Sequence, residues 1–269
     1  MAAVKDRFGR TITYLRVSVT DRCNLACRYC VPPGGGERLP REAILSFEEI
    51  EDVVRAAVRL GIRKIRLTGG EPLVRKGIEG LVERIASIEG IGDLGMTTNG
   101  ILLASKAEAL ARAGLMRVNV SLDSVDPVRY ARITGGGELE RVLEGIDAAL
   151  DAGLVPVKLN CVVERSPGEP DALAVARFAR TKGLEARFIV RMDAASGRFS
   201  PVLGGEGGDC PRCNRLRLTA DGRIRPCLFS DLAFDVRELG PREALLRAVR
   251  AKPRAGGACR PGRMQRIGG

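Results

Sequence analysis

The chain has 269 residues, and 45% of them are hydrophobic, an ordinary share for a globular protein with a real core. Its formal net charge is +11, most of which falls in residues 210–269, so the composition indicates a polyanionic partner such as nucleotide phosphates. Histidine is absent, which excludes His-containing zinc sites and Ser-His or Cys-His nucleophile pairs.

Membrane and targeting signals are missing from the sequence. No window approaches the roughly 18 consecutive apolar residues of a membrane span, and residues 1–10 contain no apolar signal segment. We therefore expect a cytoplasmic protein with no membrane partner, in which clustered cysteines are metal or redox groups rather than disulfides. Seven Phe, three Tyr and no Trp leave little for stacking on bases, so we expect no nucleic-acid partner.

A strand followed by a helix is the unit that repeats through the first 190 residues. Apolar alternation predicts the strands, and capping boxes at Ser46–Glu49 and Ser105–Glu108 predict two of the helix starts. In chain order, the pattern predicts strand 15–19, helix 46–60, strand 62–68, helix 78–88, a strand that ends at 97–99, helix 105–113, strand 116–122, helix 138–152, strand 155–162, helix 171–181 and strand 186–192.

Strand–helix alternation at this spacing indicates parallel strands with right-handed crossovers. Six strands are too few for a closed eight-stranded barrel, so we predict an α/β fold, an open six-stranded (β/α)6 partial TIM barrel, over residues 1–192. A doubly wound sheet is the alternative. Residues 193–209 contain five glycines and no periodicity and are predicted to be a linker. Residues 210–269 are predicted to form a C-terminal extension with an Asp221-Gly222 hairpin turn and a helix near 242–250.

Polar motifs follow the ends of the predicted strands. The cysteine-rich stretch 21–30 follows the first strand, and Gly69-Gly70-Glu71-Pro72 follows the second. The other strands carry Thr97-Thr98-Asn99, Ser121-Leu122-Asp123, Lys158 with Asn160, and Arg191-Met192 at or near their ends. Because the carboxyl ends of parallel strands meet at one rim, we expect these residues to surround one site.

Six of the eight cysteines form two triads. Cys23, Cys27 and Cys30 have the spacing C-x3-C-x2-C, which is typical of a metal or cluster site. A [4Fe–4S] cluster normally takes four thiolates, so a triad leaves one iron open to another ligand. The second triad has the spacing C-x2-C-x13-C, spans the predicted hairpin, and consists of Cys210, Cys213 and Cys227. Cys161 is interpreted as a core residue, and Cys259 as an incidental thiol or a fourth ligand.

The first triad, with Tyr29 before its last cysteine and G-G-E-P one strand later, resembles the signature of the radical S-adenosylmethionine (SAM) superfamily. The resemblance implies a partial barrel of that superfamily's type. It also implies that the open iron chelates the amino and carboxylate groups of SAM, which an electron from the cluster cleaves to a 5′-deoxyadenosyl radical. The implied SAM-binding residues are Tyr29, Gly69, Gly70, Glu71, Pro72, Ser121 and Met192.

The second triad, the N-R-L-R-L-T-A-D-G that it encloses and the terminal Gly-Gly resemble the GTP 3′,8-cyclase family of molybdenum cofactor biosynthesis. This resemblance covers nearly the whole chain and implies two [4Fe–4S] clusters, the second with its open iron on the guanine of GTP. The implied GTP-binding residues are Arg16, Lys64, Arg66, Thr97, Lys158, Arg187, Arg215, Leu216 and Arg217. Independently of any family, arginine forks suit phosphate oxygens.

The residues expected to serve the reaction itself are Arg16, Arg66, Lys158, Arg215, Arg217, Gly268 and Gly269. The two terminal glycines are included because a chain end without side chains can enter a narrow cavity. The implied reaction converts GTP to 3′,8-cyclo-7,8-dihydro-GTP: the ribose 3′ hydrogen is removed, the sugar radical attacks C8 of guanine, and reduction completes the product. It implies an electron-donor protein and a partner enzyme that forms a pterin from the product. The chain is expected to be a monomer or a homodimer.

Two alternatives remain from the residues alone. One is a radical SAM enzyme whose auxiliary cluster serves a peptide or protein substrate. The other is a nucleic-acid-binding module with zinc held by four thiolates, those of Cys210, Cys213, Cys227 and Cys259.

The segment 193–209 is also shorter than the one the family carries there, so we expect elements that cover the barrel to be missing.

Overall fold

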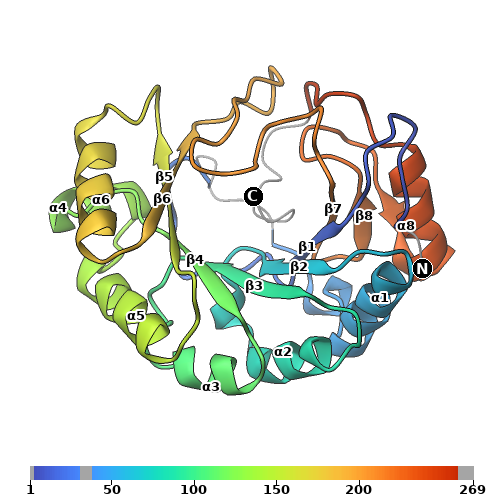
Figure 1. The fold of residues 1–269 in the computed structure, drawn as a ribbon, viewed down its shortest axis with the longest axis horizontal. Helices are drawn as coiled ribbons and strands as arrows, with labels where there is room; N and C mark the ends of the chain where they lie inside the picture. The colour runs from blue at the N-terminus through green and yellow to red at the C-terminus, as the bar shows by residue number, and fades with distance from the viewer. Residues whose placement is uncertain (1–2, 31–37, 260–269) are drawn as a thin grey trace.

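The computed structural model describes residues 3–30 and 38–259. They form one curved sheet in the order β6-β5-β4-β3-β2-β1-β7-β8-β9, with helices along its outer face (Figure 1). The strands are β1 (Tyr14–Ser18), β2 (Lys64–Thr68), β3 (Asp93–Thr98), β4 (Arg117–Ser121), β5 (Lys158–Val163), β6 (Glu185–Val190), β7 (Arg215–Leu218), β8 (Arg223–Arg225) and β9 (Phe234–Asp235).

The helices follow the strands as the sequence pattern predicted, with two additions. They are α1 (Phe47–Arg59), α2 (Ile78–Ala86), α3 (Ala107–Arg112), α4 (Pro127–Thr134), α5 (Leu139–Asp151), α6 (Pro170–Thr181), α7 (Val236–Leu239) and α8 (Pro241–Arg250). Short 3-10 turns cover Arg41–Ala43 and Pro72–Val74. The pattern missed α4 and α7. No helix in the described part of the chain is both long and apolar enough to cross a membrane.

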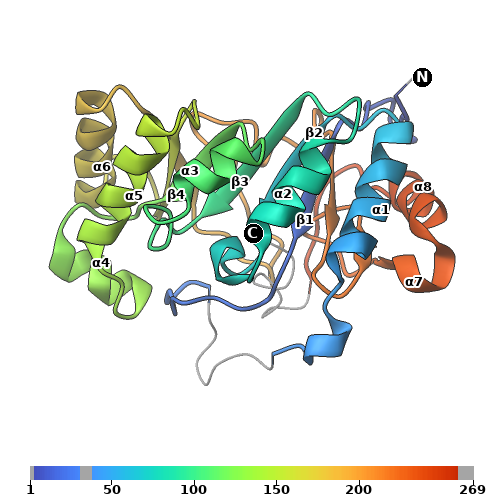
Figure 2. The ribbon, with the colours of Figure 1, turned by 90° about the horizontal axis from the view of Figure 1, so that it is seen from below.

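The first six strands confirm the open (β/α)6 partial barrel. Each of them pairs in parallel with the next, in strict chain order from β1 to β6. A doubly wound sheet would change direction in the middle of that order, so the alternative is wrong. Figure 2 shows helices α1 to α6 ranged along the same convex face. The concave face and the carboxyl ends of the strands are therefore left for a site.

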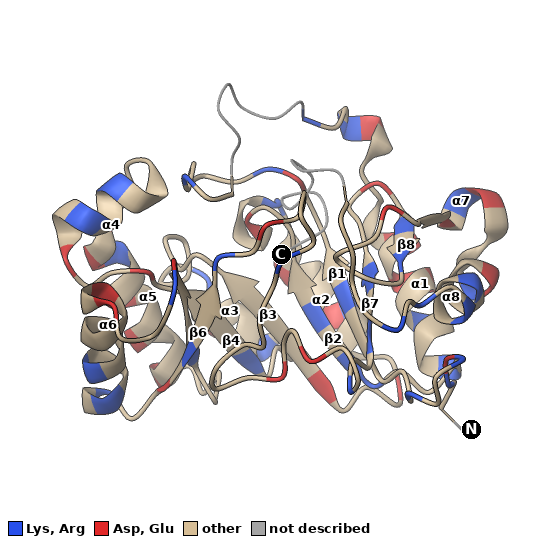
Figure 3. Ribbon diagram, turned by 90° about the horizontal axis from the view of Figure 1, so that it is seen from above, with Lys and Arg blue, Asp and Glu red and all other residues tan. Residues whose placement is uncertain are grey.

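The C-terminal residues extend the same sheet at its other edge. Strand β7 pairs in parallel with β1, so that Arg217 lies opposite Arg16 and Arg215 opposite Tyr14. The hairpin predicted at Asp221-Gly222 is confirmed, since β8 pairs antiparallel with β7 and Gly222 has a φ of +84°. Figure 3 shows Lys and Arg positions on the neighbouring strands β1 and β7. Two stretches of basic sequence thus become adjacent only through this pairing.

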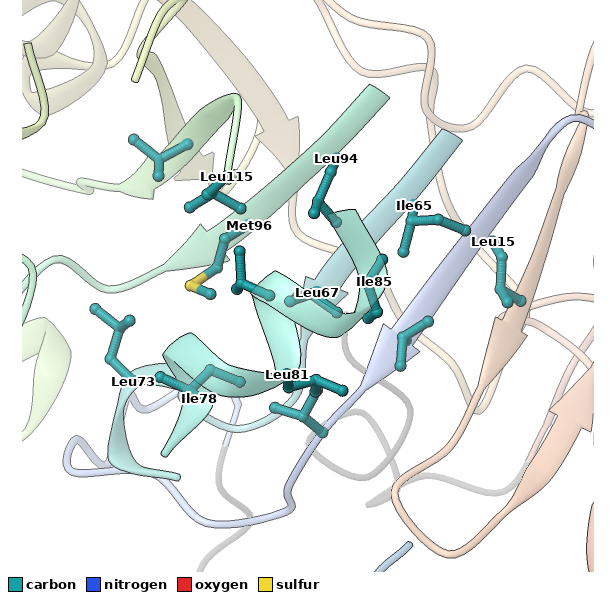
Figure 4. Packing of buried hydrophobic residues seen from close by; sticks show 14 of the residues in the cluster. Leu15, Ile65, Leu67, Leu73, Ile78, Leu81, Ile85, Leu94, Met96 and Leu115 are labelled. Carbon is teal, nitrogen blue, oxygen red and sulfur yellow. The ribbon is translucent and has the colours of Figure 1, made fainter. Parts of the chain in front are cut away.

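The hydrophobic core lies between the sheet and its helices. Ile78, Leu81 and Ile85 form one face of α2. They pack toward apolar side chains of β2 and β3, among them Leu67 and Leu94 (Figure 4). The periodicity of about 3.6 residues on the helix and two on the strand produces these matching faces. Cys161, predicted to be a core residue, is fully buried in this core.

The two predicted capping boxes had different outcomes. At the start of α1, the Ser46 hydroxyl accepts from the Glu49 amide at 3.1 Å and Glu49 accepts from the Ser46 amide at 2.7 Å, which confirms the first. The second is wrong: Ser105 donates to the Leu102 carbonyl, and α3 begins two residues later. The preceding turn leads directly into the helix there, and the Ala107 amide donates to the Leu103 carbonyl at 2.8 Å.

The predicted linker 193–209 is a compact loop beside β6. Leu203 bridges to Phe188 of β6, and Asp193 bridges to Arg198 within the loop. The division into residues 1–192, 193–209 and 210–269 therefore stays a prediction about function, while the sheet itself runs across it.

Candidate active site

A cavity of about 360 Å³ opens at the carboxyl ends of the parallel strands. This volume is typical of a site for a small molecule or cofactor. Residues from β1 through β7 and from the loops on both sides of the β7–β8 hairpin line it. Sequence-predicted residues that reach it are Arg16, Cys23, Cys27, Tyr29, Cys30, Gly69, Gly70, Thr97, Ser121, Met192, Cys210, Cys213, Arg215, Arg217 and Cys227. The expected convergence at one rim is thus found in the fold.

The first triad lies on the loop that follows β1. This loop is tied to α4 by hydrogen bonds from the Ala26 and Arg28 amides to the Thr134 and Ile133 carbonyls, at 3.0 and 3.1 Å. The thiol of Cys23 accepts from the Leu25 amide at 3.4 Å and from the Asn99 side chain at 3.8 Å. Helix α4, which the sequence pattern missed, therefore helps to hold the loop of the triad.

Burial makes these thiols harder to ionise. It raises the pKa of Cys27 to about 12, with the Asp123 carboxylate and the other two cysteines adding to the effect, and it raises the pKa of Cys23. Thiols in such surroundings ionise when a metal supplies the missing positive charge. The donor set of the first triad therefore fits an iron–sulfur cluster.

A single metal ion fits less well. Within residues 3–30 and 38–259, no three Cys, Asp or Glu side chains converge closely enough to hold one ion. Zinc–sulfur bonds of about 2.3 Å would bring thiolates to roughly 4 Å from one another. A cubane takes one thiolate per iron and so accepts a wider spacing. The zinc module with Cys259 as a fourth ligand finds no support in this arrangement.

The Gly69-Gly70 turn packs tightly against the loop that leads to the first triad. Gly69 has a φ of +148°, and the Gly70 amide donates to the Thr20 carbonyl at 2.8 Å. A Cβ on Gly70 would lie 2.3 Å from the Arg22 carbonyl oxygen. Only glycine fits this close backbone approach, and it leaves the backbone of the turn exposed to the cavity.

Glu71 and Pro72 are buried behind the cavity wall rather than on it. The Glu71 carboxylate accepts from the Asn99 amide at 2.6 Å, from the Thr98 hydroxyl at 2.8 Å and from the Leu73 amide at 2.9 Å. Burial raises the pKa of Glu71 to about 7, against these hydrogen bonds. Glu71 thereby joins the end of β2 to the end of β3, which carries the Asn99 that contacts Cys23.

Tyr29 and Ser121 lie on the cavity wall near the first triad. The Tyr29 hydroxyl donates to Asp123 Oδ2 at 2.6 Å, and Asp123 Oδ1 accepts from the Val162 amide at 2.8 Å. Burial, with the neighbouring Asp123 carboxylate, raises the pKa of Tyr29, so the phenol stays protonated as a donor. The chain Tyr29–Asp123–Val162 connects the triad loop to β5. Met192 reaches the cavity from the opposite side, just after β6.

The second triad faces the same cavity from the β7–β8 side. Cys210 and Cys213 precede β7, and Cys227 follows β8, so the hairpin brings all three to one place. Burial alone would raise the pKa of Cys213, but the Lys252 cation and the Arg215 amide hold that pKa below its ordinary value. A thiol-rich pocket with a fixed cation beside it again fits an anionic cluster.

Among the described residues, four arginines line the cavity, and one of them, Arg191, lies just after β6. Arg16 lies on β1, and Arg215 and Arg217 lie on the adjacent β7. Burial, together with the charges of Arg16 and Arg215, lowers the pKa of Arg217 to about 9. Positive charges held this close together favour a polyanion over a neutral ligand.

The remaining predicted residues lie off the cavity wall. Lys64 forms ion pairs with Asp93 and Glu206, each at 3.7 Å, and Lys158 forms one with Glu185. Arg66 is buried below Thr97 and donates to Asn119 Oδ1 at 3.1 Å. The others outside the lining are Arg187, beside the loop at Gly204, and Leu216, whose side chain is in the core. Gly268 and Gly269 lie outside the described residues.

Further polar residues line the cavity, among them Asn99, Asn160 and Lys252. The first two were expected at the rim but were given no binding role, and Lys252 was not predicted. The T-T-N-G motif and the polar face of β5 were sequence signals for the first two, but no local pattern marks Lys252. Phe199 and Phe229 stack with ring centroids 4.4 Å apart at the wall beside the second triad.

Comparisons with known proteins agree with the geometry. A family profile described as the radical SAM superfamily matches residues 17–179. A GTP 3′,8-cyclase of Pelotomaculum thermopropionicum is 45% identical, over 93% of this chain and 94% of the relative. One of Moorella thermoacetica is 42% identical, over 99% of this chain and 100% of the relative. That alignment runs over 325 positions, more than the 269 residues present here, so the relative carries segments that this chain lacks.

Solved structures share the fold at low sequence identity. Native anSMEcpe with bound AdoMet has a TM-score of 0.63 at 17% identity, over 90% of this chain and 81% of that one. Streptococcus suis SuiB has a TM-score of 0.59 at 16% identity, over 86% of this chain and 65% of that one. With the long matches to the curated cyclases, the chain belongs to the radical SAM superfamily and, within it, to the GTP 3′,8-cyclase family.

Proposed function

We propose that the protein is a radical SAM GTP 3′,8-cyclase, which converts GTP to 3′,8-cyclo-7,8-dihydro-GTP in the first step of molybdenum cofactor biosynthesis. One observation carries the proposal: two cysteine triads from opposite ends of the chain line one cavity, and Arg16, Arg215 and Arg217 line it with them. Each triad leaves one iron of a [4Fe–4S] cluster without a thiolate. The first triad would hold the cluster that binds SAM, and the second triad the cluster that binds GTP.

SAM belongs at the first triad. The Gly69-Gly70 turn lies against the loop of that triad, and Ser121 and Met192 line the same cavity, so SAM that extends from the triad would meet the Ser121 hydroxyl and the backbone near Met192. Tyr29 is fixed by Asp123 and forms part of the wall. Glu71 and Pro72 act from behind this wall, because their contacts are with the backbone that shapes it rather than with the cavity.

GTP belongs between the arginines and the second triad. A triphosphate carries about four negative charges, which Arg16, Arg215 and Arg217 match with bidentate donors. The buried Thr97 hydroxyl has no hydrogen-bond partner among the described residues and offers one to the nucleotide. Leu216 contributes its backbone only, because its side chain is fully buried.

Four further cationic side chains lie outside the cavity lining and add positive potential near it. They are Lys64, Arg66, Lys158 and Arg187. Lys158 can bind phosphate directly only if its ion pair with Glu185 breaks. Lys64 must likewise give up its ion pairs with Asp93 and Glu206. Arg66 is already fixed by Asn119 and remains a supporting charge.

The first cluster and SAM, when bound, supply the reductive cleavage that produces a radical able to remove an unactivated hydrogen atom. The chain's own part is positioning, since the ribose C3′ and the guanine C8 of one substrate must be held in a fixed relation. The arginines hold the triphosphate end and the second triad holds the base end. The apolar wall of Val162, Ile189, Phe199 and Phe229 excludes water from the intermediate sugar radical.

Anaerobic assay of the reconstituted protein tests the proposal. Iron and sulfide should each reach roughly eight per chain. With SAM, a reductant and GTP deuterated at the ribose C3′, we expect one deuterium in 5′-deoxyadenosine and a cyclic dihydro-GTP in the product analysis. Cleavage of SAM without deuterium transfer and without cyclic nucleotide would reject the cyclase and leave a peptide-modifying enzyme as the next candidate.

Two matched variants sharpen this assay. Cys213→Ser should lose the cyclic product while keeping the iron of the first triad. Cys161→Ala alters a buried thiol that does not line the cavity and should keep both clusters and turnover. One residue appended after Gly269 should lower turnover if the chain end enters the site.

The proposal also names the partners of the protein and its cellular compartment. An electron-donor protein reduces the first cluster, and a pterin-forming enzyme consumes the product. We place the reaction in the cytoplasm, where GTP and reduced thiols are available. Residues 1–192 supply the SAM site together with Arg16 and Thr97 of the GTP site, and residues 210–269 supply the second triad, Arg215 and Arg217, with 193–209 joining them.

A further inference from the structure

Lys252 is a buried lysine that the proposed reaction does not use. It lies just after α8, with 2% of its surface exposed. Lysine is almost never fully buried unless its ammonium group is paired. Within the described part of the chain, no carboxylate forms an ion pair with Lys252. Its charge is therefore balanced in another way.

Its ammonium group forms hydrogen bonds with both ends of the hairpin that bears the second triad. Lys252 Nζ donates to the Arg215 carbonyl at 2.7 Å and to the Pro226 carbonyl at 2.8 Å. Its positive charge also counteracts the effect of burial on the Cys213 thiol, whose pKa lies below its ordinary value. Pro226 directly precedes Cys227, and Arg215 follows Cys213 by two residues. Two of the three donors of the ammonium group thus bind the two arms of the hairpin that bear the triad.

The backbone next to Lys252 is held in place by hydrogen bonds from Arg10. Arg10 donates to the Pro253 carbonyl at 2.6 Å and to the Cys210 carbonyl at 2.7 Å. Arg10 is held in turn by an ion pair with Asp6 at 2.6 Å, and both side chains are nearly buried. A residue of the N-terminal segment thus joins the turn of Lys252 to the first cysteine of the triad. This leaves the ammonium group little freedom to move away from the thiols.

We propose that Lys252 is a positioning residue for the second cluster: it fixes the hairpin that bears Cys213 and Cys227 and makes the reduction potential of the cluster more positive. Hydrogen bonds to the ligand sulfurs and a nearby positive charge both stabilise the more negative, reduced state of an iron–sulfur cluster. The inference rests on the proposed presence of a cluster at this triad.

The test isolates the second cluster. In a full-length chain with Cys23, Cys27 and Cys30 replaced by Ser, iron content and a redox titration followed by electron paramagnetic resonance report on the second triad alone. Lys252→Met removes the charge and the donors at similar length, and Lys252→Arg retains the charge. Lys182→Met removes an exposed lysine of the Asp147 ion pair and serves as the control.

We expect Lys252→Met to shift the midpoint potential to a more negative value, Lys252→Arg to restore part of the shift, and the control to match the parent. Selective loss of the second cluster's iron from the chain with an intact first triad, with the fold retained by circular dichroism, would also support the proposal. Full iron with an unchanged potential would overturn it, as would loss of the whole fold. Absence of any cluster in the parent triad variant would instead refute the proposed second cluster.

Discussion

Replacement of Gly70 by alanine tests how the G-G-E-P turn supports the first triad. The added Cβ would lie 2.3 Å from the Arg22 carbonyl oxygen and 2.6 Å from the Arg22 carbonyl carbon. Ordinary contact begins at 3.4 Å, so the turn and the triad loop must separate by roughly 1 Å. Both partners are backbone and cannot rotate away as a side chain could.

We expect Gly70→Ala to lower the free energy of unfolding by about 1–3 kcal/mol, the usual cost of overpacking. Displacement of the loop by roughly 1 Å also moves Cys23, and misplacement of that size can lower turnover by about 100-fold. The assays are iron content, SAM binding and cyclic nucleotide formation, each under anaerobic conditions, with urea unfolding for stability.

Gly80→Ala is the matched control. Gly80 lies within α2, and a Cβ there would meet nothing within 4 Å. Alanine favours a helix over glycine, so this variant should gain about 0.5–1 kcal/mol and keep full turnover. Normal iron, SAM binding and turnover in Gly70→Ala would refute the reasoning, because the clash would then be relieved without any movement of the triad.

Three further predictions test other parts of the molecule. The raised pKa of Glu71, about 7, means that the protein without clusters should lose on the order of 3 kcal/mol of stability as the pH rises from 4.5 through 7; Glu71→Gln should abolish this slope in urea unfolding, and an unchanged slope would contradict the assignment. Arg217→Gln should raise the KM for GTP roughly 10- to 100-fold, whereas Arg223→Gln, exposed on the same hairpin, should leave it unchanged; equal effects would argue against a phosphate contact. Ser46→Ala removes the cap of α1 and should cost about 1 kcal/mol of stability with turnover intact, which thermal unfolding and the cyclase assay would check together.

Local patterns were sufficient for most of the elements, although they missed α4 and α7, and for the cysteine sets. The alternation at Leu15, Val17 and Val19 placed β1, and the Ser46–Glu49 pair placed the start of α1. Spacing alone grouped Cys23, Cys27 and Cys30, since neighbours in sequence remain neighbours in space. Ser105 shows the limit of such reasoning: the same capping motif is present, but its hydroxyl donates to the Leu102 carbonyl in the turn that leads into α3.

The composition of the site was decided by the tertiary structure. Pairing of β7 with β1 brings the second triad to the cavity of the first and sets Arg217 opposite Arg16. Arg66 and Thr97 come from neighbouring strands of one sheet, but the lining includes only Thr97. The buried position of Lys252 depends on the Arg10 clamp from the other end of the chain. A sequence fixes periodicity and spacing over a few turns, whereas pairing between distant strands depends on the free energy of the whole packed core, which no local window contains.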